Sequence, residues 1–185
     1  AVQAAGGIPV PVYQDSVAEE MEYIYDHAEA RFSIVENQEQ VDKVLEIKDR
    51  IPALEHVIYK DPRGLRNYRQ DFLHNYADIQ ERGREYDERD PDFYSNSVAS
   101  QTGNDTSIML YTSGTTGRPK GVMLSYSNMI SAGKNCSELE GLNKNDNMLA
   151  YLPMAWIGDN IFSHAQSYVT GYCVNCPESS ETVLE

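Results

Sequence analysis

The residues of this chain that are best suited to chemistry form one short segment rich in glycine and hydroxyl side chains. The segment contains three glycines, four hydroxyls and a lysine, and it reads Thr112-Ser113-Gly114-Thr115-Thr116-Gly117-Arg118-Pro119-Lys120-Gly121. Glycine lets the backbone approach an anion closely and adopt a positive φ, so that successive N–H groups can point inward. The hydroxyls add donors or a metal contact, and Lys120 adds a positive charge. This composition predicts a site for a polyphosphate.

The segment is not a Walker A loop, because Lys120 is followed by Gly121 and Val122 instead of a serine or threonine. The apolar run Ser107–Tyr111 before it is typical of a strand, and a helix is expected after Ser125. Anions commonly bind where a glycine-rich turn leads into a helix, because unpaired N–H groups gather there. The alternative is a surface turn without a ligand, and the spacing and the preceding strand disfavour it.

Three segments of the chain resemble a known group of enzymes. Residues 111–122 resemble the AMP-binding signature of the adenylate-forming superfamily, which includes acyl-CoA synthetases, luciferases and the adenylation domains of peptide synthetases. Within it, residues 4–13 and 151–155 most resemble long-chain fatty acyl-CoA synthetases. The likeness covers most of the chain and is weakest between Asp61 and Thr106. It implies an α/β fold of parallel or mixed sheet layers flanked by helices, and it implies that the chain is an internal part of the large domain.

The same resemblance implies an activity. These enzymes use ATP to convert a fatty acid to an acyl-adenylate and then to acyl-CoA, so it implies an acid–thiol ligase with ATP, Mg²⁺ and coenzyme A. Thr115 is the expected metal contact, although sequence alone leaves open which threonine takes that role. In the family this loop holds the β- and γ-phosphates, and the matching ATP-binding positions are Thr112, Ser113, Gly114, Thr115, Thr116, Gly117 and Lys120.

Other parts of the family's machinery have no counterpart in the sequence. The downstream Thr-Glu motif, the ribose-binding aspartate and the C-terminal catalytic lysine are absent, so no residue is assigned as catalytic. The segment alone is expected to be inactive. Two alternatives stay open: another adenylate-forming enzyme, such as an aryl-CoA ligase or an amino-acid adenylation domain, or a truncated, non-catalytic nucleotide-binding fragment.

Two positions depart from the family pattern. Tyr126 stands where a histidine is common after Ser125, and packing at the start of the helix is the favoured interpretation. Trp156 stands where a histidine is frequent after Ala155, close to the acyl and adenylate pocket in the family. Trp156 is therefore a candidate substrate-binding residue that lines or gates a fatty-acid tunnel, and ordinary core packing is the equal alternative.

Composition limits the partners. The 185 residues carry a formal net charge of −14, and the basic residues are spread without a dense block. Nucleic-acid surfaces need clustered Lys and Arg, so nucleic acid is not expected as a partner. The resemblance implies small-molecule partners instead, namely fatty acid, ATP and CoA.

The three cysteines, in a chain without a visible leader, predict reduced thiols and a cytoplasmic protein. Cys173 and Cys176 form a C-x-x-C, but no second pair or neighbouring histidines would complete a zinc site, so a structural role is expected. The histidines lie in elements expected to be unrelated, and they suggest no metal cluster. No apolar run approaches the roughly 18 residues of a membrane span, and peripheral membrane contact of the parent enzyme stays open as an expectation.

The elements that must position the loop follow from hydrophobic spacing. Strands are expected at residues 8–13, 31–36 and 56–59, alternating with helices that follow Ser16 and Asn37. Ser16 and Glu19 predict a capping box, and Asn37 with Gln40 predicts a second N-cap. This alternation predicts a parallel sheet covered by helices.

The rest of the chain is expected in two parts. Residues 61–106 form a charged insertion with one helix around Phe72, Tyr76 and Ile79, interrupted or ended at Gly83, and a polar linker. Residues 107–185 carry the phosphate loop and its following elements. These are a helix capped by Ser127 with Met129, Ile130, Gly133, Cys136 and Leu139 inward, a strand at 147–152, a helix at 155–169 and a strand at 172–176. With the βαβαβ segment of residues 1–60, these make one partial AMP-binding domain.

Overall fold

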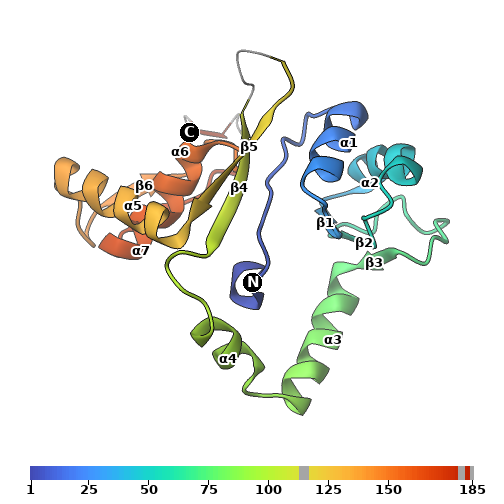
Figure 1. The fold of residues 1–185 in the computed structure, drawn as a ribbon, viewed down its shortest axis with the longest axis horizontal. Helices are drawn as coiled ribbons and strands as arrows, with labels where there is room; N and C mark the ends of the chain where they lie inside the picture. The colour runs from blue at the N-terminus through green and yellow to red at the C-terminus, as the bar shows by residue number, and fades with distance from the viewer. Residues whose placement is uncertain (113–116, 179–181, 184–185) are drawn as a thin grey trace. The chain divides into compact units, whose positions relative to one another are not determined.

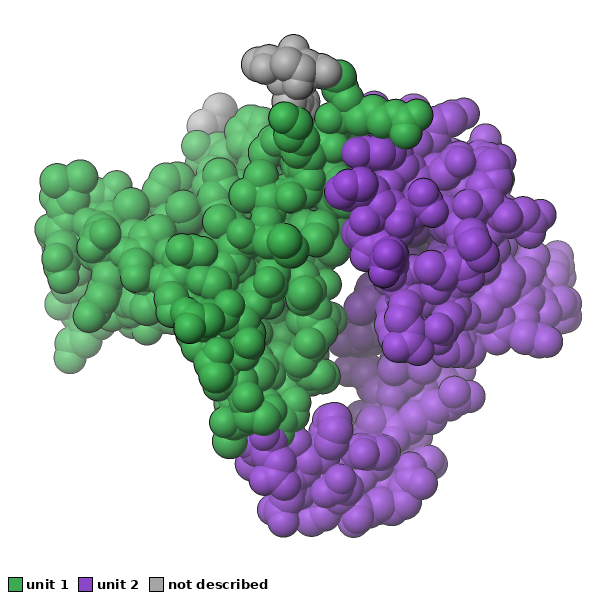
Figure 2. Space-filling view, in the orientation of Figure 1, with its two compact units in different colours: residues 1–13, 97–185 green, residues 14–96 purple. Residues whose placement is uncertain are grey.

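The computed structural model describes residues 1–112, 117–178 and 182–183. The chain divides into two compact units, coloured separately in Figure 2. Unit 1 comprises residues 1–13 and 97–185, and unit 2 comprises residues 14–96. Strands and helices alternate in both, which confirms the predicted α/β class. In the described part of the chain, no helix is both long and apolar enough to cross a membrane.

Unit 2 is built on a parallel sheet in the order β1-β2-β3. Its strands are β1 (Phe32–Val35), β2 (His56–Tyr59) and β3 (Leu73–Asn75). Its helices are α1 (Ala18–His27), α2 (Gln38–Ile47), the short 3₁₀ helix η2 (Lys48–Arg50) and α3 (Tyr76–Arg89), and α4 (Phe93–Ala99) spans the boundary between the units. Helices α1 and α2 pack against each other, and α2 and α3 contact β2 (Figure 1).

The core of unit 2 follows the predicted spacing. Val41, Val44 and Ile47 of α2 and Val57 of β2 are fully buried, and Met21 and Ile24 of α1 are buried as expected. The Asn37 side chain caps α2 by accepting a hydrogen bond from the Gln40 N–H, an interaction typically worth about 1 kcal/mol.

Several local predictions for unit 2 are wrong. Ser16 makes no capping box, because Val17 takes the N-cap position of α1 without a side-chain bond. Strand β3 and helix α4 were not expected, and α3 runs through Gly83 without ending there. On β1, Phe32 and Ile34 are exposed while Ser33 and Val35 are buried, because side chains alternate between the two faces of a strand and one face of β1 is exposed.

Two histidines expected in unrelated elements lie next to each other in unit 2. His56 Nδ1 and His74 Nε2 are 2.9 Å apart, and the Phe32 ring stacks on His56. Burial lowers the pKa of His74 below its ordinary 6.5, and the nearby His56 and Arg82 lower it further. The pair therefore favours the neutral imidazole of His74 in the folded state.

The His74 shift predicts that unit 2 loses stability in mild acid. Because the folded pKa lies below the unfolded value, the unfolded chain binds more protons, and the stabilisation is fully present above about pH 6.5 and falls as the pH drops through that value. We expect the unfolding midpoint of the chain to decrease between pH 7.5 and 5.5, and to decrease less in His74→Gln. Circular dichroism melts of both proteins at each pH test this. The same acid sensitivity in both proteins would contradict it.

Unit 1 contains the predicted phosphate loop. An antiparallel hairpin is formed by β4 (Thr106–Thr112) and β5 (Lys120–Ser125), and a parallel pair by β6 (Asn147–Leu149) and β7 (Cys173–Asn175). The helical elements are the 3₁₀ helix η1 (Gln3–Ala5), α5 (Tyr126–Glu140), α6 (Ile157–Asp159), the π-helix η3 (Asn160–Ala165) and α7 (Gln166–Thr170). Helix α5 contacts both strands of the hairpin and packs against η3 and α7 (Figure 1).

The core of unit 1 lies between the hairpin and the helices. Ile108 and Leu110 from β4, Met129 from α5 and Ala165 from η3 are buried together, with Leu124 and Ile161 packed against them. Gly133 of α5 lies so close to η3 that a Cβ placed there would be 2.8 Å from the carbonyl carbon of Ala165. The glycine therefore permits close contact between these two helices.

Some predictions for unit 1 are also wrong. Ser125, rather than Ser127, caps α5, in a capping box with Asn128. Leu139 and Ile130 are exposed rather than inward-facing. Residues 8–13 form no assigned strand, although the Met109 N–H donates to the Pro9 carbonyl. Pro9 and Pro11 lack the N–H groups that a strand ladder requires.

Candidate phosphate-binding site

The predicted phosphate segment connects the two strands of a hairpin. Strand β4 ends at Thr112 and β5 begins at Lys120, and these two residues are partners in the antiparallel ladder. The helix expected after Ser125 is α5, which begins at Tyr126, but strand β5, which was not expected, lies between the loop and this helix. The loop residues accordingly do not lead into a helix N-terminus.

The ladder determines the face on which the base of the loop lies. Leu110 pairs with Val122 and Thr112 pairs with Lys120, and side chains alternate between faces along a strand. Thr112 and Lys120 therefore lie on the same face as Ile108 and Leu110, the residues that pack against Met129 and Ala165. They continue that face beyond the buried core, where both are exposed. A hydroxyl and an ammonium group thus lie side by side at the end of the hairpin.

Two glycines of the motif have distinct geometric roles. Gly117 has a φ of +130°, a conformation that other residues rarely adopt. Gly121 lies in β5 opposite Tyr111, and a Cβ there would be 3.0 Å from the Met109 sulfur and 3.3 Å from the Tyr111 ring. The first glycine permits the turn, and the second permits close packing between side chains on the other face.

The remaining members of the predicted ATP site lie outside the described residues. These are Ser113, Gly114, Thr115 and Thr116, and the predicted metal contact at Thr115 is among them. Of the predicted set, the structure describes Thr112, Gly117 and Lys120, and it brings Thr112 and Lys120 together as ladder partners. The inward-pointing amides of the hypothesis stay a prediction.

The charge of Lys120 is available for a ligand. The ion pairs recorded in the described part of the chain involve other residues, and Lys120 forms none of them. An exposed ammonium group that forms no ion pair with the described carboxylates can attract an anion, which matters in a chain with a net charge of −14.

Trp156 lies on a separate segment of unit 1, at the N-cap of α6. Trp156 is 52% exposed in this chain, and its assignment as a substrate-binding residue stays a prediction. Met154 and Ile157 beside it are also exposed, whereas Ala155 is buried. The turn therefore presents an apolar surface that includes the indole.

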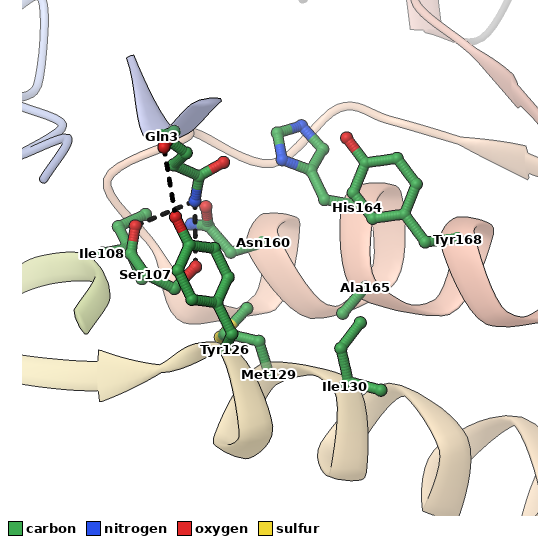
Figure 3. A pocket seen from close by; sticks show the side chains of 10 residues that line it. All are labelled: Gln3, Ser107, Ile108, Tyr126, Met129, Ile130, Asn160, His164, Ala165 and Tyr168. Atoms are coloured by element: carbon green, nitrogen blue, oxygen red, sulfur yellow. Dashed lines mark hydrogen bonds between the residues drawn. The ribbon is translucent and has the colours of Figure 1, made fainter. Parts of the chain in front are cut away.

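A small pocket of about 100 Å³ lies between η1, β4 and the helices (Figure 3). Tyr126 lines it, and its hydroxyl donates to Gln101 Oε1 at 2.8 Å. Burial raises the pKa of Tyr126, and the negative charge of Asp105 adds to this effect. Across the pocket, Gln3 Nε2 donates to the Ser107 carbonyl and hydroxyl. Tyr126 thus serves as a hydrogen-bonded packing residue at the start of α5.

Sequence reasoning missed the polar residues of this pocket. Asn160 and His164 line it from η3, and Gln3 lines it from η1. One signal was available, because an asparagine inside a helix is unfavourable unless its side chain has a specific partner.

Neither thiols nor metal ligands form a further site in the described residues. Cys136, Cys173 and Cys176 are all free thiols. No group of three or more histidine, cysteine or carboxylate side chains that could hold a metal occurs in residues 1–112, 117–178 and 182–183.

Comparison with known proteins identifies the family. A family model described as AMP-binding enzyme matches residues 1–185. The chain is 35% identical over 158 residues to the long-chain-fatty-acid–CoA ligase ACSBG2 of Xenopus laevis, which covers 83% of this chain and 21% of that protein. The chain therefore spans about a fifth of the length of this curated relative.

Solved structures show the same fold. An anthranilate CoA ligase in complex with anthranoyl-AMP matches with a TM-score of 0.66 at 21% identity, covering 94% of this chain and 31% of that chain. ATP-bound MatB from Rhodopseudomonas palustris matches with a TM-score of 0.62 at 20% identity, covering 95% and 31%. Together with the family match across residues 1–185, these similarities lead to one conclusion: the chain belongs to the AMP-binding enzyme family.

Proposed function

We propose that this chain is the phosphate-binding segment of a longer enzyme that activates a fatty acid with ATP and then transfers the acyl group to coenzyme A. The observation that carries the proposal is the hairpin base, where Thr112 and Lys120 are paired on one face at the two ends of a loop rich in glycine and hydroxyls. Family membership supports ATP as the nucleotide.

The proposed first step is an adenylation. An oxygen of the fatty-acid carboxylate attacks the α-phosphorus of ATP, an acyl–oxygen–phosphorus bond forms, and the bond from the α-phosphorus to the bridging oxygen breaks. Pyrophosphate leaves with the electron pair of that bond. Charge on the leaving phosphates increases in the transition state, so groups fixed around them lower the barrier.

In this proposal the residues of the chain stabilise the pyrophosphate leaving group. The Lys120 ammonium and the Thr112 hydroxyl contact the β- and γ-phosphates, and amides between residues 113 and 119 complete the site. Gly117 is suited to this role because its positive φ permits a sharp turn that other residues disfavour. The thiol of coenzyme A would then attack the acyl carbon of the adenylate and release AMP, a step for which these residues supply no group.

In this proposal Mg²⁺ binds mainly to the phosphates of the nucleotide. The described residues supply no cluster of carboxylates for a metal, which fits an ion held mainly by phosphate oxygens and water. We propose the Thr115 hydroxyl as the protein contact. The ion would neutralise charge on the phosphates.

A fatty acid is the proposed acid because the curated relative of Xenopus laevis is named a long-chain-fatty-acid–CoA ligase. The exposed Trp156, with Met154 and Ile157 beside it, supplies an apolar surface suited to an acyl chain. We propose Trp156 as the substrate-binding residue, in a cytoplasmic enzyme that contacts membranes only peripherally.

The proposal predicts acid-dependent exchange of pyrophosphate into ATP. The full-length protein containing this segment is purified, and exchange of labelled pyrophosphate is measured with palmitate, benzoate and a set of amino acids. We expect exchange with palmitate and little with the other acids. Strong exchange with benzoate or an amino acid would instead indicate one of the other adenylate-forming activities. A folded protein without exchange for any acid would contradict the proposal.

A further inference from the structure

Asn160, at the start of the π-helix η3, has an unusual set of contacts. It is only 3% exposed. Its side-chain amide Nδ2 donates to two backbone carbonyls of the preceding turn, those of Met154 and Trp156, each at 2.8 Å. Both hydrogens of the amide are therefore used on one short segment, the turn of residues 153–156.

These bonds fix the backbone on both sides of the tryptophan. The Trp156 N–H donates to the Pro153 carbonyl at 2.9 Å, while the Trp156 carbonyl accepts from Asn160. The Trp156 backbone is held at φ −94° and ψ 141°. With the peptide groups before and after it hydrogen-bonded, the direction of its Cα–Cβ bond is set by the turn.

The indole ring of Trp156 is half exposed, whereas its backbone is held by hydrogen bonds. Trp156 is 52% exposed, and it makes no side-chain cap to α6. Its direction therefore depends on the turn more than on packing around the ring. The buried Asn160 anchors the turn and so fixes the Cα–Cβ bond from which the half-exposed ring extends.

Asn160 also lines the small pocket of unit 1, but both hydrogens of its amide are used on the turn. Its immediate neighbour Ile161 packs against the apolar core, and asparagine is an unfavourable residue inside helices. It also occupies the first position of a π-helix, a rare distortion that occurs frequently at functional sites. Asn160 is thus unfavourable for its own helix, and its side chain stabilises the preceding turn instead.

We propose that Asn160 is a positioning residue that holds Trp156 in the direction required to contact the acyl chain. The inference rests on the proposed function, in which Trp156 binds the fatty acid. Asn160 does not contact the substrate in this account. It acts through the Met154 and Trp156 carbonyls.

The test uses the fact that Trp156 is the only tryptophan of the chain. Time-resolved fluorescence anisotropy and acrylamide quenching of the 185-residue protein therefore report on this side chain alone. In the unmodified protein we expect the anisotropy to decay mainly with overall tumbling. Free nanosecond rotation of the indole in the unmodified protein would overturn the proposal without the need for any variant.

Asn160→Asp is nearly isosteric but removes both donors, and Asn160→Ala removes the whole amide. In each variant we expect a fast component in the anisotropy decay and stronger quenching by acrylamide. Ser163→Ala is the matched control, because Ser163 is buried in the same π-helix and donates to Asp159 at 2.8 Å rather than to the turn. Equal changes in Ser163→Ala and the Asn160 variants would show a general loosening of the helix and would refute the specific role.

A second measurement tests whether the direction of Trp156 affects the binding of the fatty acid. In the pyrophosphate exchange assay of the full-length protein, Asn160→Asp is expected to raise the KM for fatty acid about tenfold while changing the KM for ATP little, as loss of about one useful hydrogen bond would. If the unmodified protein shows no exchange, the proposed function fails, and the anisotropy result still decides the positioning role. If exchange is present but the indole is equally rigid in all variants, the positioning role fails and the function stands.

Discussion

Replacing Lys120 by alanine is expected to weaken ATP binding to the full-length protein about tenfold to a hundredfold. A hydrogen bond from a charged donor contributes about 1.5–3 kcal/mol, and each 1.4 kcal/mol corresponds to about a factor of ten in affinity. Lys120 is exposed, lies beside Thr112 and has no ion-pair partner among the described residues, so the fold does not depend on its charge. Titration calorimetry with ATP measures the effect, and circular dichroism confirms the unchanged fold.

Lys134→Ala is the matched control for that experiment. Lys134 is an exposed lysine of α5 in the same unit, so its removal changes the net charge by the same amount at a different place. We expect nearly unchanged ATP affinity in this variant. If both variants weakened ATP binding equally, the loss would reflect the general field of the protein rather than a contact at the hairpin.

The second large effect concerns the contact between α5 and the π-helix. Gly133→Ala places a Cβ 2.8 Å from the carbonyl carbon and 2.9 Å from the carbonyl oxygen of Ala165, and backbone atoms cannot rotate away. Alanine gains up to about 1 kcal/mol in helix propensity, but overpacking costs about 1–3 kcal/mol or more. Since forced backbone movement lies at the upper end of that range, we expect a net loss of about 1–2 kcal/mol. Thermal unfolding should show a decrease of several degrees in the midpoint of unit 1, roughly 4–8 °C per kcal/mol.

Gly83→Ala is expected to have the opposite effect on stability. Gly83 lies within α3, is exposed, and a Cβ there meets nothing within 4 Å. This substitution should stabilise unit 2 by about 0.5–1 kcal/mol through helix propensity alone. If Gly133→Ala stabilised the protein as Gly83→Ala does, the close packing of α5 on η3 would be wrong.

The elements that sequence predicts well are those with a strong local pattern. Met21, Ile24 and Tyr25 repeat at helical spacing and are buried on α1. Asn37 is a capping residue whose partner lies only three residues away, at Gln40. Such interactions are encoded within a few residues and need no knowledge of the rest of the fold.

The elements missed by sequence analysis depend on distant partners. Strand β3 is only three residues long and lies next to a highly charged segment, and its pairing with β2 defines it. Strand β5 shows no clean alternation of buried and exposed residues, and its partner β4 determines it. Because β5 was missed, the phosphate motif was recognised while its setting in a hairpin was not.

The same distinction separates the predicted from the unpredicted site residues. The motif around Lys120 is contiguous, so its composition alone indicates an anion site. The role of Asn160 comes from contacts with the carbonyls of Met154 and Trp156, which form only when the turn folds back on the helix. An asparagine inside a predicted helix was the only local sign of it.

The central claim, that the loop between β4 and β5 holds the β- and γ-phosphates, is tested most directly by comparing ATP with AMP in titrations of unmodified protein and Lys120→Ala. AMP lacks the phosphates that Lys120 is proposed to contact. We expect the substitution to weaken ATP binding about tenfold or more and to leave AMP binding unchanged. Equal losses for the two nucleotides, or no loss for either, would contradict it.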